Sequence, residues 1–132
     1  MKFLVVDDDL VSRTKMQQIL KEFGDCVLAE SGHDAIAECV HAWDKGIPFD
    51  LISLDIGMPD MTGIDVLKAI RALEIHKGLK KEWVAKVVMV TSMADQDSVI
   101  GCMKAGCDSY IVKPFDLEKV KEKLGSLGFS LA

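Results

Sequence analysis

Polar side chains that could do chemistry stand directly after four short apolar runs of this sequence. They are Asp7, Asp8 and Asp9 after residues 3–6, Asp55 after residues 51–54, Thr91 after residues 87–90, and Lys113 after residues 109–112. Three or more carboxylates in one place repel one another and raise each other's pKa, unless a cation lies among them. Mg²⁺ takes one or two carboxylates together with waters and phosphate oxygens, so it is the cation that a small acidic cluster indicates. A hydroxyl and an ammonium opposite that cation indicate an anionic ligand, and a phosphoryl group is the simplest one.

The elements that must bring these residues together follow from the hydrophobic pattern. Unbroken apolar runs bounded by turn residues are typical of strands in a parallel sheet that is covered on both faces. The predicted strands are residues 3–6, 26–29, 51–54, 87–90 and 109–112, each followed by an amphipathic stretch. This alternation predicts an α/β fold with a doubly wound, five-stranded parallel sheet, a (βα)5 arrangement. Ligand sites of open parallel sheets lie beyond the carboxyl ends of the strands, where the polar residues are expected.

The helical stretches carry apolar residues at spacings of three and four, which predicts one buried face on each helix. The side chains expected to face the core include Val11, Met16, Ile19, Leu20 and Phe23 in the first helix, Val99, Ile100 and Met103 in the fourth, and Leu117, Val120 and Leu124 in the last. Short polar side chains with an acceptor oxygen favour helix starts. We expect such starts at Ser31, at Thr62, at Ser92 with Asp95, and near Asp116.

Length and charge narrow the function classes. The 132 residues fit one domain, and no linker divides residues 1–132. The net charge of −5 argues against general nucleic-acid binding, because affinity for phosphate backbones needs a basic surface. No apolar run approaches the roughly 20 residues of a membrane span, and the N-terminus turns acidic too early for a signal peptide. We therefore expect a cytoplasmic protein that neither inserts into a membrane nor binds nucleic acid directly.

The cysteines and histidines do not indicate a metal site. The four cysteines, Cys26, Cys39, Cys102 and Cys107, form no CxxC pair and lie in apolar segments, so we expect reduced core or near-core residues. The three histidines are scattered, with no acidic or cysteine partner at ligand spacing, which argues against zinc.

Four motifs together identify a family. FLVVDDD, LISLDIGMPDMTG, VVMVTS and AGCDSYIVKPF resemble, in order and spacing, the motifs of response-regulator receiver domains of the CheY-like, single-domain kind. The resemblance covers roughly residues 2 to 125. It implies a flavodoxin-like arrangement of the predicted sheet and a role in two-component signal transduction.

The resemblance implies a role for each residue at the acidic edge. Asp55 resembles the phosphoacceptor, Asp8 the direct Mg²⁺ ligand, and Asp7 an indirect ligand or second carboxylate. The backbone carbonyl of Gly57 resembles a further ligand. Asp9 stands where the family pattern tolerates many residues, and no metal role is assigned to it.

The last two strands carry the residues that resemble the switch. Thr91 and Lys113 look like the groups that hold the phosphoryl oxygens. Tyr110, three residues before the lysine, matches the aromatic residue that switches together with Thr91. The bond between Lys113 and Pro114 matches a peptide bond that is usually cis in this family.

The implied partners are a sensor histidine kinase or histidine phosphotransfer protein, which supplies the phosphoryl group, and a downstream protein target. The target would bind the face formed by the fourth helix, fifth strand and fifth helix, and we expect a monomer. An alternative within this class is an intermediate phosphoryl carrier in a phosphorelay. A small metal-dependent phosphotransferase enzyme is the other class, but Gly57 stands where such enzymes carry a second Asp. We expect no enzyme beyond self-phosphorylation and slow self-dephosphorylation.

Two stretches depart from the usual pattern. Residues 74–86 make a lysine-rich connection that is longer than is usual for receiver domains; either the third helix continues into it or a basic loop projects beside the fourth strand. The resemblance implies that the residues at the positions of Gly57 and Met93 flank the route by which water attacks the acyl phosphate, and neither residue offers a good hydrogen bond to that water. This pair of residues predicts the slow self-dephosphorylation.

Overall fold

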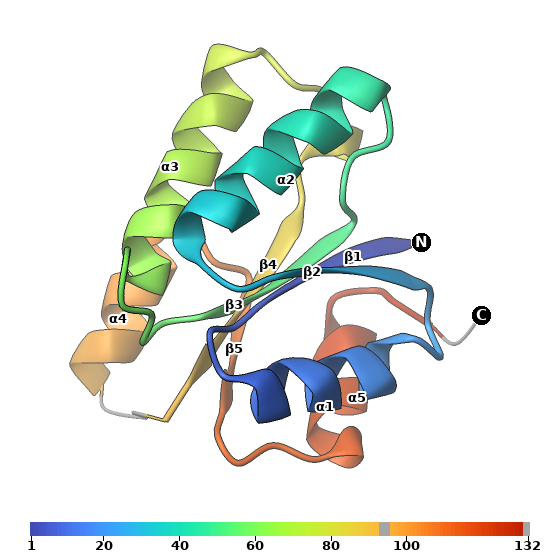
Figure 1. The fold of residues 1–132 in the computed structure, drawn as a ribbon, viewed down its shortest axis with the longest axis vertical. Coiled ribbons are helices and arrows are strands. Elements are labelled where there is room, and N and C mark those ends of the chain that lie inside the picture. The colour runs from blue at the N-terminus through green and yellow to red at the C-terminus, as the bar shows by residue number, and fades with distance from the viewer. Residues whose placement is uncertain (93–95, 131–132) are drawn as a thin grey trace.

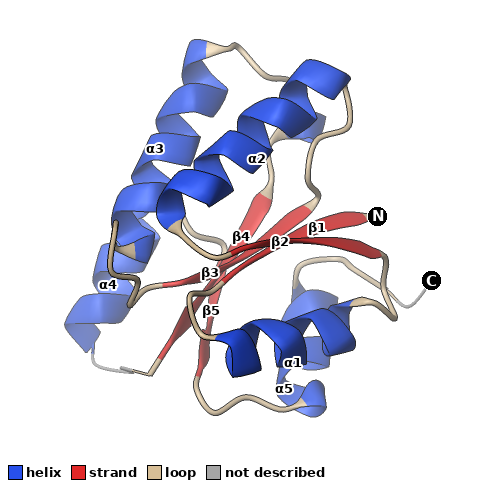
Figure 2. Ribbon diagram, in the orientation of Figure 1, coloured by secondary structure: helices blue, strands red, loops and turns tan. Residues whose placement is uncertain are grey.

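The computed structural model describes residues 1–92 and 96–130, with the side chain of Gln96 excepted. Five parallel strands form one sheet in the order β2-β1-β3-β4-β5 (Figure 2). The strands are β1 (Lys2–Val6), β2 (Asp25–Ala29), β3 (Leu51–Asp55), β4 (Lys86–Thr91) and β5 (Ser109–Val112). The predicted doubly wound, five-stranded parallel sheet is confirmed, and each predicted strand is present within one residue at either end.

Helices cover both faces of the sheet (Figure 1). The helices α1 (Leu10–Leu20) and α5 (Leu117–Ser126) lie on one face. The helices α2 (Gly32–Lys45), α3 (Gly63–His76) and α4 (Gln96–Ala105) lie on the other. The third helix continues to His76, into the lysine-rich connection. The rest of that connection to β4 contains a short 3-10 helix (Lys81–Trp83).

The strand residues alternate between two hydrophobic clusters, as side chains of a strand must. Phe3 and Val5 of β1 pack in the cluster beneath α1 and α5. Leu4 and Val6 pack in the cluster beneath the other three helices. All five residues of β3, at the centre of the sheet, are buried. The sheet is therefore a rigid platform, and its register decides which residues meet at its edges.

The register brings the carboxyl ends of the strands together. Val6 is the partner of Leu54, Asp55 is the partner of Val90, and Thr91 is the partner of Val112. The residues directly after β1 and β5 therefore lie at the same edge of the sheet as the end of β3.

Three expected helix starts are confirmed. The side chain of Ser31 accepts a hydrogen bond from Asp34 N, that of Thr62 from Asp65 N, and that of Asp116 from Lys119 N, at 3.1, 3.2 and 2.8 Å. The expected start at Ser92 and Asp95 falls outside the described residues, because Asp95 is not among them.

The expected inward direction of Val11 is wrong, since 74% of this residue is exposed. The remaining residues of that face, from Met16 to Phe23, are buried. Val11 precedes Met16 by five residues, which is about 140° around a helix, so the two side chains cannot share a narrow face.

Three expected core residues near the last two helices are also exposed: Ile100 by 42%, Met103 by 54% and Leu117 by 36%. The buried side of α4 contains Cys102. Ile100 and Met103, two residues before and one residue after it, point to other sides of the helix. Leu117 opens α5 and has no preceding turn to cover it, so burial starts one turn later at Val120.

The cysteine prediction is confirmed, because all four are free; Cys26 is half-buried and the other three are buried. None of the helices in the described part of the chain is long and apolar enough to cross a membrane.

Candidate functional site

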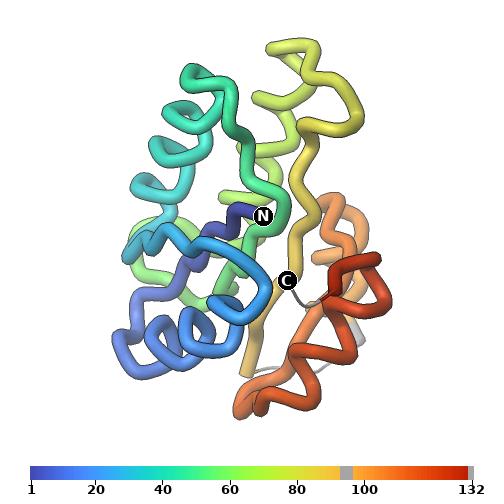
Figure 3. Tube along the Cα trace, turned by 90° about the vertical axis from the view of Figure 1, so that its right-hand side faces the viewer, coloured from blue at the N-terminus to red at the C-terminus, as the bar shows by residue number. Residues whose placement is uncertain are grey.

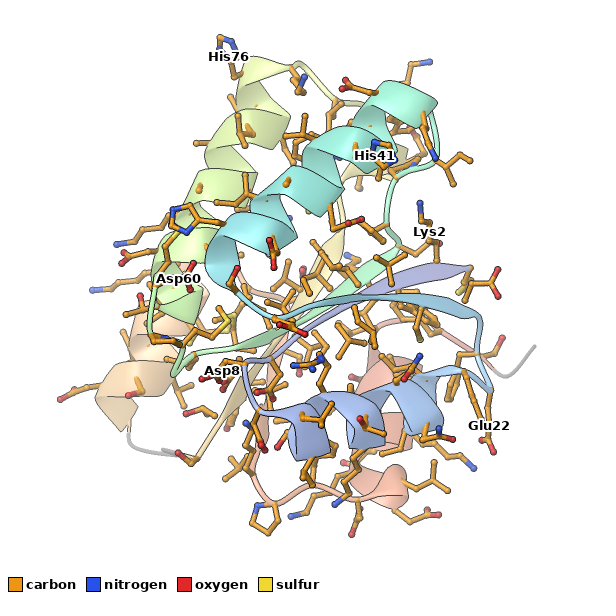
Figure 4. All side chains as sticks on the ribbon, viewed as in Figure 1. Lys2, Asp8, Glu22, His41, Asp60 and His76 are labelled. Atoms are coloured by element: carbon orange, nitrogen blue, oxygen red, sulfur yellow. The ribbon has the colours of Figure 1, made fainter. Side chains whose placement is uncertain are left out.

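The end of β1 places two carboxylates side by side in different surroundings. Asp7 is buried and Asp8 is exposed. The backbone N–H of Asp7 continues the sheet by donating to Ala29 O at 3.2 Å, and Asp7 Oδ1 accepts from Asp9 N at 2.9 Å. The Asp7 side chain is thus held at the edge of the sheet, while that of Asp8 faces solvent (Figure 4).

The end of β3 is fixed by a close approach of α3. The backbone N–H of Gly63 donates to Ile56 O at 2.9 Å, and a Cβ at Gly63 would collide with the carbonyl oxygen of Asp55. Only glycine permits this contact. The loop of residues 56–62 is therefore pinned at both ends, with Asp55 at its base, 6% exposed.

The loop is also attached to α2. Asp60 accepts hydrogen bonds from the backbone N–H groups of Gly32 and His33, both at 3.1 Å, and lies 2.6 Å from His33 Nδ1. Figure 4 shows Asp60 beside the first turn of α2. The amides hold the pKa of the Asp60 carboxyl well below its ordinary value. Sequence reasoning missed this attachment, because Asp60 and its partners are far apart in the chain.

The three carboxylates Asp7, Asp8 and Asp55 meet at this edge. Each offers an oxygen, and these oxygens lie within 4.8 Å of one another. Within the described residues this is the group of carboxylates, thiols and imidazoles that is close enough to hold a metal ion. Oxygen donors of this kind suit a hard divalent cation such as Mg²⁺.

Lys113, directly after β5, faces the carboxylates. Its Nζ lies 3.0 Å from Asp7 Oδ2 and 3.5 Å from Asp55 Oδ1. Burial disfavours the ammonium, but the hydrogen bond with Asp7 and the charge of Asp55 outweigh it, so the pKa of Lys113 is raised. The bond from Lys113 to Pro114 is cis, the geometry that the resemblance implies.

The pKa of Asp55 is raised from 3.8 to about 6. Burial is the largest cause, the negative charge of Asp7 adds to it, and the positive charge of Lys113 opposes it. Repulsion between carboxylates, which the sequence predicts, is thus present but second to desolvation. The charge of Asp55 therefore remains costly even with Lys113 Nζ 3.5 Å away.

Gly57 leaves one side of the site open. Its backbone N–H lies 3.4 Å from Asp55 Oδ1, and a Cβ added at Gly57 would meet no atom within 4 Å. Met93, the other residue expected to flank the route of water, lies outside the described residues.

The expected switch residues lie at and below the same edge. Thr91 ends β4 and is buried, and its carbonyl accepts from Lys113 N at 2.7 Å. Tyr110 is half-buried in β5, with Lys123 Nζ of α5 5.0 Å from the centre of its ring. Tyr110 therefore already touches the helix on which the expected output face depends.

Two further residues shape the site. Asp9 caps α1 by accepting hydrogen bonds from Ser12 N at 3.2 Å and Ser12 Oγ at 2.8 Å, which lower the pKa of Asp9. Arg13 is 7% exposed and donates through Nη1 to Asp7 O at 2.8 Å. Sequence reasoning missed Arg13; the signal was its place three residues before Met16, on the buried side of the helix.

A parallel (βα)5 sheet thus joins, at its carboxyl edge, an acidic cluster to a half-buried lysine. Residues 3–125 match the family model of the response regulator receiver domain. The chain belongs to this family, and it is a receiver domain of two-component signal transduction.

The chain is similar to chemotaxis proteins along almost its whole length. The chemotaxis protein CheY of Pseudomonas aeruginosa is 38% identical over 125 residues, 94% of this chain and 93% of that protein. CheY of Listeria monocytogenes is 36% identical over 124 residues, 94% of this chain and 95% of that protein.

Solved structures share the fold. A chain of the CheX–CheY–BeF3–Mg²⁺ complex from Borrelia burgdorferi superposes with a TM-score of 0.81 at 27% identity, covering 98% of this chain and 90% of that chain. A chain of the co-crystal structure of Saccharomyces cerevisiae Ypd1, a histidine phosphotransfer signalling protein, with the receiver domain of Ssk1 gives a TM-score of 0.82 at 26% identity. That match covers 97% of this chain and 88% of that chain.

Proposed function

We propose that Asp55 accepts a phosphoryl group from a phosphohistidine and that residues 1–132 act as one receiver domain in a chemotaxis-type pathway. The observation that carries this proposal is the group of Asp7, Asp8 and Asp55 oxygens within 4.8 Å, faced by Lys113 Nζ 3.5 Å from Asp55 Oδ1. A nucleophilic carboxylate stands where both a divalent cation and an ammonium can offset the charge of a phosphoryl group.

The donor set fits Mg²⁺. The side chains of Asp8, Asp7 and Asp55 and the carbonyl of Gly57 would hold the ion. When bound, Mg²⁺ would neutralise the charge on the oxygens of the transferring group. It would also favour the ionised form of Asp55, whose pKa of about 6 otherwise leaves part of it protonated near neutral pH.

The chain's own residues would carry the transfer. An Asp55 oxygen attacks the phosphorus, the bond from phosphorus to the histidine nitrogen breaks, and the imidazole leaves with the electron pair. Lys113 Nζ is close enough to Asp55 to contact the new acyl phosphate, and the Thr91 hydroxyl would hold a second oxygen. Because Lys113 stands in place beforehand, catalysis is mainly positioning and charge stabilisation.

The phosphoryl group would change the output face. The negative charge of the phosphoryl group draws Lys113 away from Asp7. It also draws Thr91 toward the site, and Tyr110 turns into the space that Thr91 leaves. The ring of Tyr110 then loses its contact with Lys123, 5.0 Å away in this structure. A target protein would bind the resulting surface of α4, β5 and α5.

The relatives support a terminal regulator over an intermediate of a phosphorelay, because both of those described above are chemotaxis proteins. The phosphoryl donor would be a sensor histidine kinase or a histidine phosphotransfer protein, the second of which is the partner named in the Ssk1 co-crystal structure. The free cysteines suit the reducing cytoplasm, where we place the protein as a monomer.

The proposal predicts labelling at one residue. Incubation with acetyl phosphate and Mg²⁺ should add one phosphoryl mass to the wild type, none without Mg²⁺, and none to Asp55→Asn. Intact-mass measurement reads this out, with Asp9→Asn as the matched control because Asp9 caps a helix beside the site. Equal labelling of Asp55→Asn and the wild type would remove the assignment.

A further inference from the structure

The connection between α3 and β4 carries a surface that the proposed function does not use. We call it the lysine face: exposed Lys77, Lys80, Lys81 and Lys86 around exposed Ile75 and Val84. In Figure 3 this connection forms the top of the molecule, where the yellow trace turns back into β4. In Figure 4, His76 at its start and Asp8 of the acidic cluster lie at opposite ends of the sheet.

The lysine face is held in place at both ends. Buried Glu74 accepts from Arg71 Nη1 at 2.9 Å and from Ala85 N at 3.1 Å. Arg71 Nη1 also donates to Ala85 O at 2.8 Å. The same clamp therefore fixes the end of α3 and the residue that precedes β4. A backbone fixed in this way loses little conformational entropy when a partner binds.

Apolar side chains stand at the centre of this basic surface. Ile75 is 81% exposed and Val84 is 38% exposed. Two hollows lie beside Val84: one is lined by Ile75 and Leu79, and the other by Lys81 and Lys86 together with the acidic residues Glu82 and Asp108. One apolar side chain of a partner can enter beside Val84 while acidic neighbours reach the lysines.

The charge of the lysine face is opposite to that of the whole chain, whose net charge is −5. Such a patch steers negatively charged partners to one place on the surface. We propose that the lysine face is a docking surface for an acidic segment of a partner protein that carries an apolar anchor residue. An acidic segment fits better than a nucleic acid, because the apolar centre would lie against phosphates and the rest of the surface would repel them.

The lysine face lies at the opposite end of the sheet from the acidic cluster. A partner held at the amino end of the sheet leaves the acidic cluster accessible, so it can stay bound while a phosphoryl donor works at the other end. The proposal does not depend on phosphoryl transfer to Asp55, and it survives if that assignment fails.

The test is a titration of the ¹⁵N-labelled protein with a short synthetic peptide of Glu and Asp residues around one Leu. We expect saturable amide shifts confined to residues 75–86 and their contacts, with a Kd of roughly 100 μM. The variant Lys80→Glu/Lys81→Glu should bind at least about tenfold more weakly. Lys15→Glu/Lys21→Glu is the matched control, because both lysines are exposed in or directly after α1, on the other face of the sheet, and it should bind within about twofold of the wild type.

Two further arms separate the occupants. Replacing the Leu of the peptide by Ser, or Ile75 by Ser in the protein, should weaken binding several-fold if the apolar centre takes part. Absence of saturable shifts at about 1 mM peptide, equal weakening in both double variants, or equally tight binding of an oligothymidylate would overturn the proposal.

Discussion

The two ends of the sheet both hold charged side chains out of solvent, and they balance those charges in opposite ways. At the amino end, Arg71 lies between two carboxylates, with Nη1 2.9 Å from Glu74 Oε1 and Nη2 3.0 Å from Asp108 Oδ2. The second oxygen of Glu74 accepts from Ala85 N, and Asp108 Oδ2 accepts from Val87 N at 2.8 Å. Lys86 Nζ, 3.9 Å from Asp108 Oδ1, adds a second cation, so two cations face two carboxylates and the chain itself matches the charges there.

At the carboxyl end, three carboxylates share one ammonium. Lys113 Nζ reaches Asp7 and Asp55, while the oxygens of Asp7, Asp8 and Asp55 crowd within 4.8 Å. The raised pKa of Asp55 reports the resulting cost. The comparison teaches that a self-sufficient charge network can stabilise the fold, whereas an unbalanced one is what the proposed function requires of a site whose missing charge comes from a ligand. Each prediction below tests one side of this difference.

The largest effect is expected from breaking the matched network. Glu74→Ala leaves Arg71 with one carboxylate fewer and the buried N–H of Ala85 without its acceptor, so the free energy of unfolding should fall by about 3 kcal/mol. Urea denaturation measures this change. Mg²⁺ affinity should stay within about twofold, since Glu74 is at the opposite end of the sheet from the cluster.

Glu82→Ala is the matched control for Glu74→Ala. Glu82 is exposed in the same connection, and its loss should change the free energy of unfolding by no more than about 0.5 kcal/mol. If the two variants are equally stable, the network at the amino end does not stabilise the fold and the comparison fails.

The second prediction concerns the unbalanced end. Asp8→Asn removes an exposed oxygen donor and one negative charge, so the Kd for Mg²⁺ should rise by roughly tenfold, which is about 1.4 kcal/mol. Its free energy of unfolding should not fall, because the loss relieves repulsion. Asp9→Asn should change Mg²⁺ binding little, as Asp9 caps α1. Calorimetric titration of both variants measures this, and the reverse order would assign the ligand to the wrong residue.

The contrast between the ends also explains what the sequence could predict. The apolar runs predict the strands and the polar residues that end them. One topological rule then predicts that Asp7, Asp55 and Lys113 gather, because a parallel sheet brings all carboxyl ends to one edge. No comparable rule covers the amino end. Glu74 looks like the start of a solvated, lysine-rich connection, yet it is 4% exposed, because its partner Arg71 and the backbone of Ala85 bury it.

The sequence also did not predict exactly which face of each helix is buried. Apolar side chains such as Val11 and Ile100 fit an approximate amphipathic pattern, but the buried stripe of each helix is narrow, and its exact phase depends on tertiary packing. Arg13 shows the reverse case. It occupies an inward position that apolar patterning skips, and it is satisfied there by the carbonyl oxygen of Asp7.

The third prediction uses the pKa of Asp55, about 6 in the folded protein against an ordinary 3.8. A carboxyl group whose pKa is higher in the folded state keeps its proton better there, so the free energy of unfolding falls as pH rises from about 4 to about 6. Asp55→Asn cannot ionise and escapes this loss. Without Mg²⁺ it should therefore melt at least a few degrees above the wild type at pH 7.5 and close to it at pH 4.

Calorimetric melting at both pH values checks the third prediction, and Asp9→Asn is again the control. Added Mg²⁺ should stabilise the wild type at pH 7.5 more than Asp55→Asn, because the ion supplies the charge that the site lacks. A variant that melts below the wild type at pH 7.5 would mean that the cluster is already balanced by Lys113.

The smallest effect is expected at the open side of the site, where Gly57 offers no side chain to hold an attacking water. Gly57→Asn adds a carbonyl and an amide in space that the structure leaves free, since a Cβ there meets no atom within 4 Å. An oriented water lowers the barrier to hydrolysis, whereas an open site only admits a reactant already at high concentration. Phosphorylated Gly57→Asn should therefore lose its phosphoryl group several-fold faster than the wild type, about 1 kcal/mol in the barrier.

The decay of the phosphorylated mass in Mg²⁺ buffer measures this, and Gly57→Ala, which fills the space without a polar group, is the control. If Gly57→Ala slows decay and Gly57→Asn does not speed it, the access of water rather than its orientation sets the lifetime of the phosphoryl group. The space beside Gly57 would then matter because it admits water, and the lack of a polar side chain there would not.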